Sequence, residues 1–179
     1  MRNLDKLEKT LRTEIIYKGK KVILQRDEVE LVSGRKTRRE FVIHPGSAAI
    51  IPILPDKRII LIKQYRYAVK NILYEIPAGT LDTGETPTQC AHRELKEETG
   101  YTAGRLEKLI QFYPSPGISN ELMHLFLAKD LKKADEKPSS DETIEVIEVS
   151  MDDCLEMIKT GSIIDAKTIC GIFLCSKDL

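Results

Sequence analysis

The segment from residue 79 to residue 101, GTLDTGETPTQCAHRELKEETGY, constrains this chain more than any other part of it. If its second half is helical, Glu94, Glu97 and Glu98 lie at positions i, i+3 and i+4, so their carboxylates share one face. Like charges at that spacing repel each other and destabilise an isolated helix. The acidic face is therefore expected either to lie in water or to bind a cation. Carboxylate oxygens suit hard ions such as Mg²⁺ or Mn²⁺.

The residues around the acidic stretch predict where the helix begins and ends. Residues 86–89, TPTQ, place a threonine at the N-cap, a proline at the first helical position and a glutamine at the third, which is a capping box. Gly100 supplies a left-handed stop. Ala91 and Leu95 form a narrow apolar stripe opposite the acids. Residues 79–84 are expected to form a loop before the helix.

This segment resembles the Nudix hydrolase signature, G-x5-E-x7-R-E-U-x-E-E-x-G-U. Only the last position, which is usually aliphatic, departs from the pattern, because Tyr101 stands there. That departure changes packing under the helix and leaves the acidic positions intact. A solvated acidic surface helix, the alternative interpretation, has no reason to reproduce the loop glycine, the loop glutamate and the cap glycine together. The matching residues are Gly79, Glu85, Arg93, Glu94, Leu95, Glu97, Glu98 and Gly100.

Composition argues against several classes of protein. Lysine plus arginine equals aspartate plus glutamate at 28 each, which argues against broad nucleic-acid binding. No apolar run approaches a membrane-spanning length, and residues 1–14 lack the apolar core of a signal peptide. The four cysteines form no C-x-x-C pair, which favours buried thiols in a reducing compartment. We therefore expect a cytoplasmic protein that binds neither membranes nor nucleic acid.

The residue pattern divides the chain near residue 45. Residues 3–12 suggest a short helix, and a Ser33-Gly34 turn separates the last two of three predicted strands. Three strands alone are marginal in water, so this sheet is expected to pack on the main domain or on another subunit. We expect a small antiparallel β-sheet appendage over residues 1–45 and a Nudix hydrolase domain over residues 46–179. The three strands are expected at residues 15–17, 22–31 and 40–43.

The main domain mixes strands and helices. Its first two strands are expected to form a hairpin through residues 55–57. This order of elements predicts an α+β or mixed α/β/α layered domain, and the Nudix resemblance likewise implies an α/β/α sandwich with a mixed sheet. Besides the acidic helix, the expected strands are residues 48–54, 59–65, 73–76, 107–113, 122–128 and 143–149, and the expected helices are residues 151–159 and 166–175.

A second resemblance concerns the substrate. Pro116 lies 16 residues beyond Gly100, an offset similar to that of the ADP-ribose pyrophosphatase subgroup. Residues 113–121, YPSPGISNE, resemble the subgroup's loop, and residues 75–79, EIPAG, resemble its entry to the signature. The resemblance implies Mg²⁺-dependent hydrolysis of ADP-ribose to AMP and ribose 5-phosphate. The alternatives are a pyrophosphatase for another nucleotide sugar, such as GDP-mannose, and a non-catalytic ADP-ribose sensor.

The acidic residues can be assigned to metal binding. Glu94 and Glu98, one helical turn apart, are expected to be direct ligands, with Glu97 and Glu85 as further candidates. The resemblance adds the main-chain carbonyl of Ala78. Bound Mg²⁺, or Mn²⁺ in its place, would neutralise the pyrophosphate and lower the pKa of a bound water.

Two catalytic roles lie beside the metal site. Arg93 does not ligate cations and is expected to orient a glutamate through a charge-assisted hydrogen bond. The resemblance implies a general base before the late strand, and aligning on residues 144–146 gives Glu142. Asp141 and Glu145 are close enough in sequence to take that role instead.

Substrate contacts are expected on both sides of residue 45. Arg66 resembles an arginine that contacts the diphosphate, and Arg39 and Glu40 are candidates near the adenine. Tyr17 or Phe41 could stack on the base, although core packing explains these aromatics equally well. The loop expected over the terminal ribose contains Pro116, Gly117, Ser119 and Glu121. The resemblance also implies a homodimer that exchanges its N-terminal sheets, with both subunits contributing to each active site.

Overall fold

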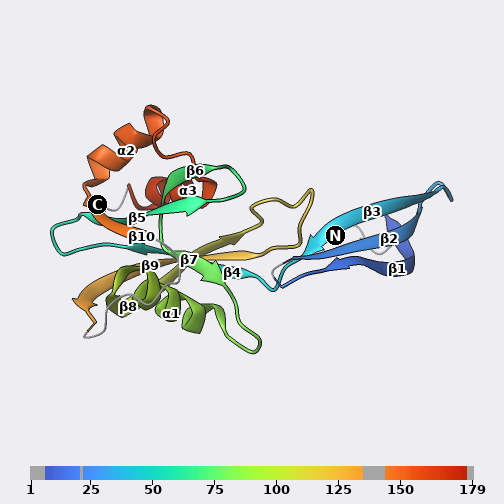
Figure 1. The fold of residues 1–179 in the computed structure, drawn as a ribbon, viewed down its shortest axis with the longest axis horizontal. Coiled ribbons are helices and arrows are strands. Elements are labelled where there is room, and N and C mark those ends of the chain that lie inside the picture. The colour runs from blue at the N-terminus through green and yellow to red at the C-terminus, as the bar shows by residue number, and fades with distance from the viewer. Residues whose placement is uncertain (1–6, 21, 135–143, 177–179) are drawn as a thin grey trace. The chain divides into compact units, whose positions relative to one another are not determined.

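A computed structural model describes residues 7–20, 22–134 and 144–176 (Figure 1). The chain forms two compact units. One consists of Met1–Pro45 with Ser115–Leu122, and the other consists of Gly46–Pro114 with Met123–Leu179. The loop expected over the ribose therefore belongs to the same unit as the N-terminal sheet.

The first unit is built on an antiparallel sheet with the strand order β1-β2-β3. Its strands are β1 (Glu8–Lys18), β2 (Ile23–Leu31) and β3 (Lys36–Ile43). The predicted turn is confirmed, because Gly34 has a φ of 78° and its N–H donates to the Leu31 carbonyl at 2.8 Å. The predicted N-terminal helix is wrong from Glu8 onward, where the chain is a strand. Pairing along β2 supplies hydrogen bonds over the whole strand, whereas a short isolated helix is marginal in water.

The loop Ser115–Leu122 is attached to the end of β3. The Val42 N–H donates to the Ile118 carbonyl at 2.8 Å, and the Asn120 N–H donates to the Val42 carbonyl at 3.3 Å. The side chain of Asn120 also accepts the His44 N–H at 2.7 Å. These bonds continue the sheet pairing into the loop and fix its backbone beside Phe41 and Val42.

The second unit contains two sheets, with the strand orders β10-β5-β6 and β7-β4-β9-β8. The β4–β9 pair is parallel and its neighbours are antiparallel, so the sheet is mixed as predicted. The strands are β4 (Ser47–Pro52), β5 (Ile59–Arg66), β6 (Asn71–Glu75), β7 (Ala78–Thr80), β8 (Tyr101–Phe112), β9 (Met123–Lys133) and β10 (Ile144–Val149), and the helices are α1 (Pro87–Thr99), α2 (Met151–Lys159) and α3 (Ala166–Cys175).

The predicted hairpin between the first two strands of this unit is confirmed only at its turn, and its strands do not pair beyond that point. A turn does follow β4, since the Leu54 N–H donates to the Arg58 carbonyl at 2.9 Å. Beyond one bridge between Ile53 and Ile59, however, β4 and β5 lie in different sheets. The reason is that β4 already has β7 on one edge and β9 on the other, and every one of its residues is buried.

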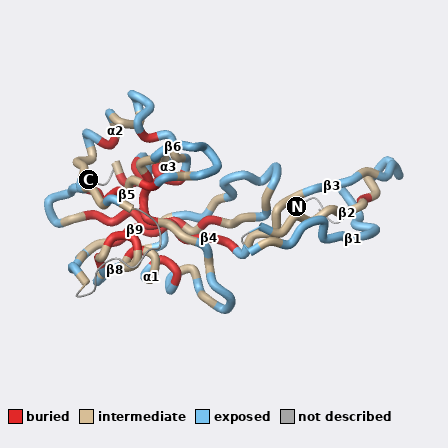
Figure 2. The backbone as a smooth tube through the Cα atoms, in the orientation of Figure 1, coloured by how far each residue is buried: buried red, intermediate tan, exposed pale blue. Residues whose placement is uncertain are grey.

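Alternate residues of β4 pack in two separate hydrophobic cores, one on each face of the sheets. Ile50 packs in the core that includes Leu95 of α1, and Ile51 packs in the core that includes Ile172 of α3. Helix α1 thus covers one face and helices α2 and α3 cover the other, as Figures 1 and 2 show. This arrangement confirms the predicted α/β/α sandwich. Close packing of α3 depends on Gly171, where a Cβ atom would lie 2.7 Å from Ile51 Cδ1.

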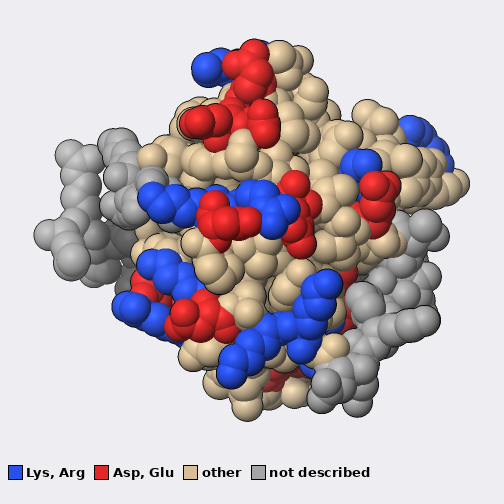
Figure 3. Space-filling view, turned by 90° about the vertical axis from the view of Figure 1, so that its left-hand side faces the viewer, with Lys and Arg blue, Asp and Glu red and all other residues tan. Residues whose placement is uncertain are grey.

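Three features of the described residues bear on the expectations from composition: helix length, cysteine burial and surface charge. No helix in residues 7–20, 22–134 or 144–176 is long and apolar enough to cross a bilayer. Three of the cysteines are buried thiols, whereas Cys170 is exposed. On the face drawn in Figure 3, basic and acidic side chains lie side by side rather than in a broad patch of one sign.

Candidate active site

The acidic helix begins and ends where the sequence predicts. The side chain of Thr86 accepts the Gln89 N–H at 3.3 Å, and the side chain of Gln89 accepts the Thr86 N–H at 2.9 Å, which completes the capping box. At the other end Gly100 has a φ of 72° and donates its N–H to the Lys96 carbonyl. The apolar stripe is buried, so this face docks α1 on the sheet and sets the position of the acids.

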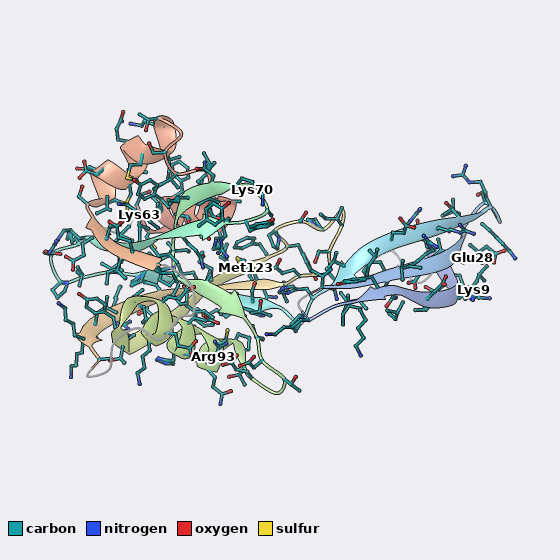
Figure 4. The ribbon with its side chains drawn as sticks, in the orientation of Figure 1. Lys9, Glu28, Lys63, Lys70, Arg93 and Met123 are labelled. Atoms are coloured by element: carbon teal, nitrogen blue, oxygen red, sulfur yellow. The ribbon has the colours of Figure 1, made fainter. Side chains whose placement is uncertain are left out.

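Arg93, labelled in Figure 4 beside α1, binds both the loop acid and the helix acids. Its guanidinium donates to both oxygens of Glu85, at 2.8 and 2.9 Å, and to Glu94 at 2.6 Å. It also reaches Glu97 at 3.2 Å and the Thr80 carbonyl at 3.1 Å. The prediction that Arg93 orients one glutamate therefore understates its contacts. The bidentate pair holds the pKa of Glu85 at about 2, so this carboxylate is ionised at neutral pH.

Glu94 lies against the backbone of β7. A Cβ atom on Gly79 would lie 1.8 Å from Glu94 Oε1, so only glycine allows this approach. Gly79 itself belongs to the short strand β7, not to the loop that the sequence suggested. Burial raises the pKa of Glu94, and Arg93 opposes that shift.

Glu98 lies deeper, one turn further along the same face. Its side chain accepts the Ala78 N–H at 2.9 Å, and the residue is only 7% exposed. Burial raises the pKa of Glu98 to about 8; the Ala78 N–H lowers it in part, and Glu94 raises it further. Arg66 and Lys167 act in the opposite direction, which places positive charge on this side of α1.

The Glu94–Glu98 pair has the properties of a divalent-cation site. Glu98 is a buried carboxylate whose ionisation is disfavoured further by Glu94, and Glu94 is balanced in part by Arg93 at 2.6 Å; a hard cation with oxygen ligands would offset the remaining negative charge. Glu85 and Glu97, the further candidates, are paired with Arg93. Within residues 7–20, 22–134 and 144–176, no group of three or more acidic, histidine or cysteine side chains is arranged to hold a metal ion. The resemblance implied the Ala78 carbonyl as a ligand. The contact seen between Ala78 and the acids is its N–H, which donates to Glu98.

A second charged cluster lies beyond the signature. Arg66 donates from Nε and Nη2 to the two oxygens of Glu75, both at 2.7 Å. Lys167 on α3 donates to the same carboxylate and pairs with Asp165 at 3.0 Å. Sequence reasoning missed Lys167 and Asp165. The available signal was a lone charge in the apolar helix Ala166–Cys175, because a buried charge requires a partner.

The substrate residues expected in the first unit have partners within that unit. Arg39 pairs with Glu8 on β1, and Glu40 pairs with Arg26 on β2. Tyr17 is 59% exposed, so it is not a core residue. Phe41 is partly buried and precedes the residue that holds the loop. The loop itself carries Pro116, Gly117, Ser119 and Glu121, and Ser119 Oγ accepts the Glu121 N–H at 3.1 Å.

The general-base candidates are only partly described. Glu142 and Asp141 lie outside the described residues. Glu145, the third candidate, is on β10, where its side chain is 64% exposed and pairs with Lys63 at 2.8 Å. Figure 4 labels Lys63, which lies on β5, the strand paired with β10. This ion pair makes Glu145 the weaker choice.

Comparison with known proteins extends these observations. Residues 43–170 match the NUDIX domain family. The chain is 43% identical over 167 residues to the ADP-ribose pyrophosphatase of Bacillus subtilis, covering 92% of this chain and 90% of that protein. It is equally identical, over the same shares, to the methanol dehydrogenase activator of Bacillus methanolicus. A GDP-mannose pyrophosphatase of Escherichia coli is 40% identical over 133 residues, 69% of each chain.

The fold has a solved counterpart as well. A crystal structure of an ADP compounds hydrolase superposes with a TM-score of 0.85, covering 96% of this chain and 93% of that one. Its sequence is 22% identical to this chain, so it supports the shared fold.

Proposed function

The chain belongs to the Nudix family, and we propose that it hydrolyses the pyrophosphate bond of ADP-ribose to AMP and ribose 5-phosphate in the presence of Mg²⁺. The observation that carries this proposal is the buried Glu98 beside the partly buried Glu94, next to an arginine that binds Glu94 and the loop acid Glu85. The similarity to the Bacillus subtilis enzyme over nearly the whole chain supports ADP-ribose as the substrate.

In this proposal the glutamates bind the metal and Arg93 orients them. Glu94 and Glu98 would hold the metal, with Glu97, Glu85 and the Ala78 carbonyl as additional ligands. When bound, Mg²⁺ offsets the negative charge of the pyrophosphate and lowers the pKa of a water. Arg93 orients the acids, because its planar guanidinium donates hydrogen bonds to carboxylates of both the loop and the helix.

Hydrolysis also requires a group that accepts a proton from water. The water oxygen bonds to one phosphorus, the bridging P–O bond breaks, and the two monophosphates separate. We assign the proton to Glu142, just before β10. The alternative at Glu145 is disfavoured because Lys63 already binds that carboxylate at 2.8 Å.

Substrate recognition is assigned to the residues expected from the sequence. Arg66 would contact the diphosphate, with Arg39, Glu40 and either Tyr17 or Phe41 near the base. The loop with Pro116, Gly117, Ser119 and Glu121 would cover the terminal ribose.

A homodimer is part of the proposal. Every residue of β1 is exposed in the single chain, including Ile15, Ile16 and Tyr17, and a three-stranded sheet with so little cover is marginal alone. Exchange of the N-terminal sheets between two copies would bury these side chains. A monomeric mass by light scattering at micromolar concentration would contradict it. The proposed location is the cytoplasm, in keeping with the buried thiols.

The experiment that tests the proposal is product analysis. The purified protein, given ADP-ribose and Mg²⁺, is expected to release AMP and ribose 5-phosphate in equal amounts, and Glu98→Gln is expected to release neither. Release of adenosine or of inorganic phosphate in place of these products would refute the assigned bond.

A second candidate is hydrolysis of GDP-mannose, which the 40% identity to the Escherichia coli enzyme favours. The same acids would serve, and only recognition of the base and sugar would differ. A purely sensory Nudix domain is disfavoured because every acid of the signature is present.

A further inference from the structure

The first turn of α3 is bonded to the strand that leads into the signature. The Ile76 N–H donates to Thr168 Oγ1 at 2.8 Å, where both residues are buried. Asp165 caps the helix by accepting the Thr168 N–H at 3.0 Å. Two residues after Ile76, Ala78 donates its N–H to Glu98. The C-terminal helix is thus connected to the acidic helix through a few consecutive backbone groups.

The same turn holds the carboxylate that binds Arg66. Glu75 is 1% exposed and shares its two oxygens between Arg66 and Lys167. Burial alone would raise the pKa of Glu75, but Arg66 and Lys167 together lower it below its ordinary value. The carboxylate is therefore ionised and balanced by two cations, one from β5 and one from α3.

Lys167 is a buried charge in an otherwise uncharged helix. The other residues of α3 are uncharged, and a buried ion pair contributes little to stability compared with apolar residues of similar volume. Its observable contacts are Glu75 and Asp165. Since Asp165 Oδ1 holds Lys167 while Oδ2 caps the helix, the ammonium group has a defined position.

We propose that Lys167 is a positioning residue, which fixes Glu75 so that Glu75 in turn holds the Arg66 guanidinium ready for the diphosphate of the substrate. This inference rests on the proposed function, in which Arg66 contacts that diphosphate. An arginine side chain loses considerable rotational freedom when it is ordered, so a rigid carboxylate partner lowers the cost of binding. Arg66 is 39% exposed while Glu75 is buried, so the fixed end of the pair lies inside the protein.

Nuclear magnetic resonance tests the positioning without any substrate. The Nε–H signal of Arg66 in ¹⁵N-labelled protein, assigned by its loss in Arg66→Lys, should exchange slowly with water in the wild type. Lys167→Met is expected to speed that exchange about tenfold, and Lys167→Arg to restore most of the protection. Lys159→Met, a surface lysine that is 73% exposed, is the matched control. Unchanged exchange in Lys167→Met would overturn the proposal.

Enzyme kinetics test whether the positioning serves the substrate. Lys167→Met should raise KM for ADP-ribose about tenfold and leave kcat within about twofold, with less effect from Lys167→Arg. In an Arg66→Met background Lys167→Met should change KM no further, because its effect passes through Arg66. An additive effect in that background would overturn the proposal.

The experiments distinguish failure of this proposal from misfolding of the variant and from failure of the proposed function. If Lys167→Met fails to fold, Asp165→Asn removes the charge that holds Lys167 and keeps an oxygen for the Thr168 N–H, and it should give a smaller rise in exchange and in KM; no rise in either would overturn the proposal. If the wild-type protein does not hydrolyse ADP-ribose, the proposed function fails, while the exchange measurement still decides whether Lys167 positions Arg66.

Discussion

Glu98→Gln should stabilise the metal-free protein and abolish its response to Mg²⁺. Glu98 is 7% exposed, and burial raises its pKa from the ordinary 4.5 to about 8. Its folded-state pKa is above its unfolded value, so the native state binds more protons between these limits. The contribution of Glu98 to stability is then most favourable below pH 4.5 and declines as the pH rises towards 8. Glutamine carries no charge and keeps an oxygen for the Ala78 N–H, so the variant lacks this decline.

The magnitude follows from the size of the shift. A shift from 4.5 to about 8 at 1.36 kcal/mol per pKa unit costs wild-type protein about 4 kcal/mol at pH 8 and about 1 kcal/mol at pH 5. The stability advantage of Glu98→Gln should therefore grow by about 3 kcal/mol between these pH values. For a chain of this size that difference corresponds to about 6–12 °C in Tm.

Thermal melts in EDTA at pH 5, 6, 7 and 8 measure this advantage, with and without excess Mg²⁺. Glu145→Gln is the matched control, because it makes the same substitution at a carboxylate that is 64% exposed. Mg²⁺ should raise the Tm of wild type, most strongly at pH 8, and leave Glu98→Gln unchanged. If Glu98→Gln were less stable than wild type in EDTA at pH 8, the argument from a buried uncompensated carboxylate would be refuted.

Three further predictions concern single residues. Gly79→Ala should lower activity at least about a hundredfold, because its Cβ would lie 1.8 Å from Glu94 Oε1 and displace that carboxylate, which we propose binds the metal. Mg²⁺ titration of activity would show whether the affinity for the metal falls too. Gly171→Ala should lower the free energy of unfolding by about 1–3 kcal/mol through contact with Ile51, with KM unchanged, as chemical denaturation and kinetics would reveal. Glu142→Gln should abolish turnover while Mg²⁺ still raises the Tm; normal turnover would remove Glu142 as the base.

The acidic helix could be predicted to the residue because its signals are local. The cap at Thr86, the stop at Gly100 and the apolar stripe all lie within the helix or next to it. The end helices Met151–Lys159 and Ala166–Cys175 were predictable for the same reason. Hydrogen bonds inside a helix depend only on neighbouring residues, so a short window of sequence contains the relevant information.

Strand pairing and the second charged cluster were not predictable in this way. The predicted pairing of β4 with β5 ends at the turn because β9, far along the chain, pairs with one edge of β4. Likewise Glu8–Lys18 becomes a strand only through its partner β2. Lys167 lies 92 residues from Glu75, and nothing near either residue indicates the other. Contacts of this kind are set by tertiary packing, which overrides local propensity.

Hydrolysis by the purified protein tests the central claim most directly. The kcat/KM for ADP-ribose, GDP-mannose, UDP-glucose, NADH and diadenosine polyphosphate would be measured in Mg²⁺ and in EDTA, for wild type and Glu98→Gln. We predict that ADP-ribose is the preferred substrate and that turnover is lost both in EDTA and in the variant. Preference for another substrate would contradict the substrate assignment, and wild-type rates in Glu98→Gln would contradict the acidic helix as the catalytic metal site.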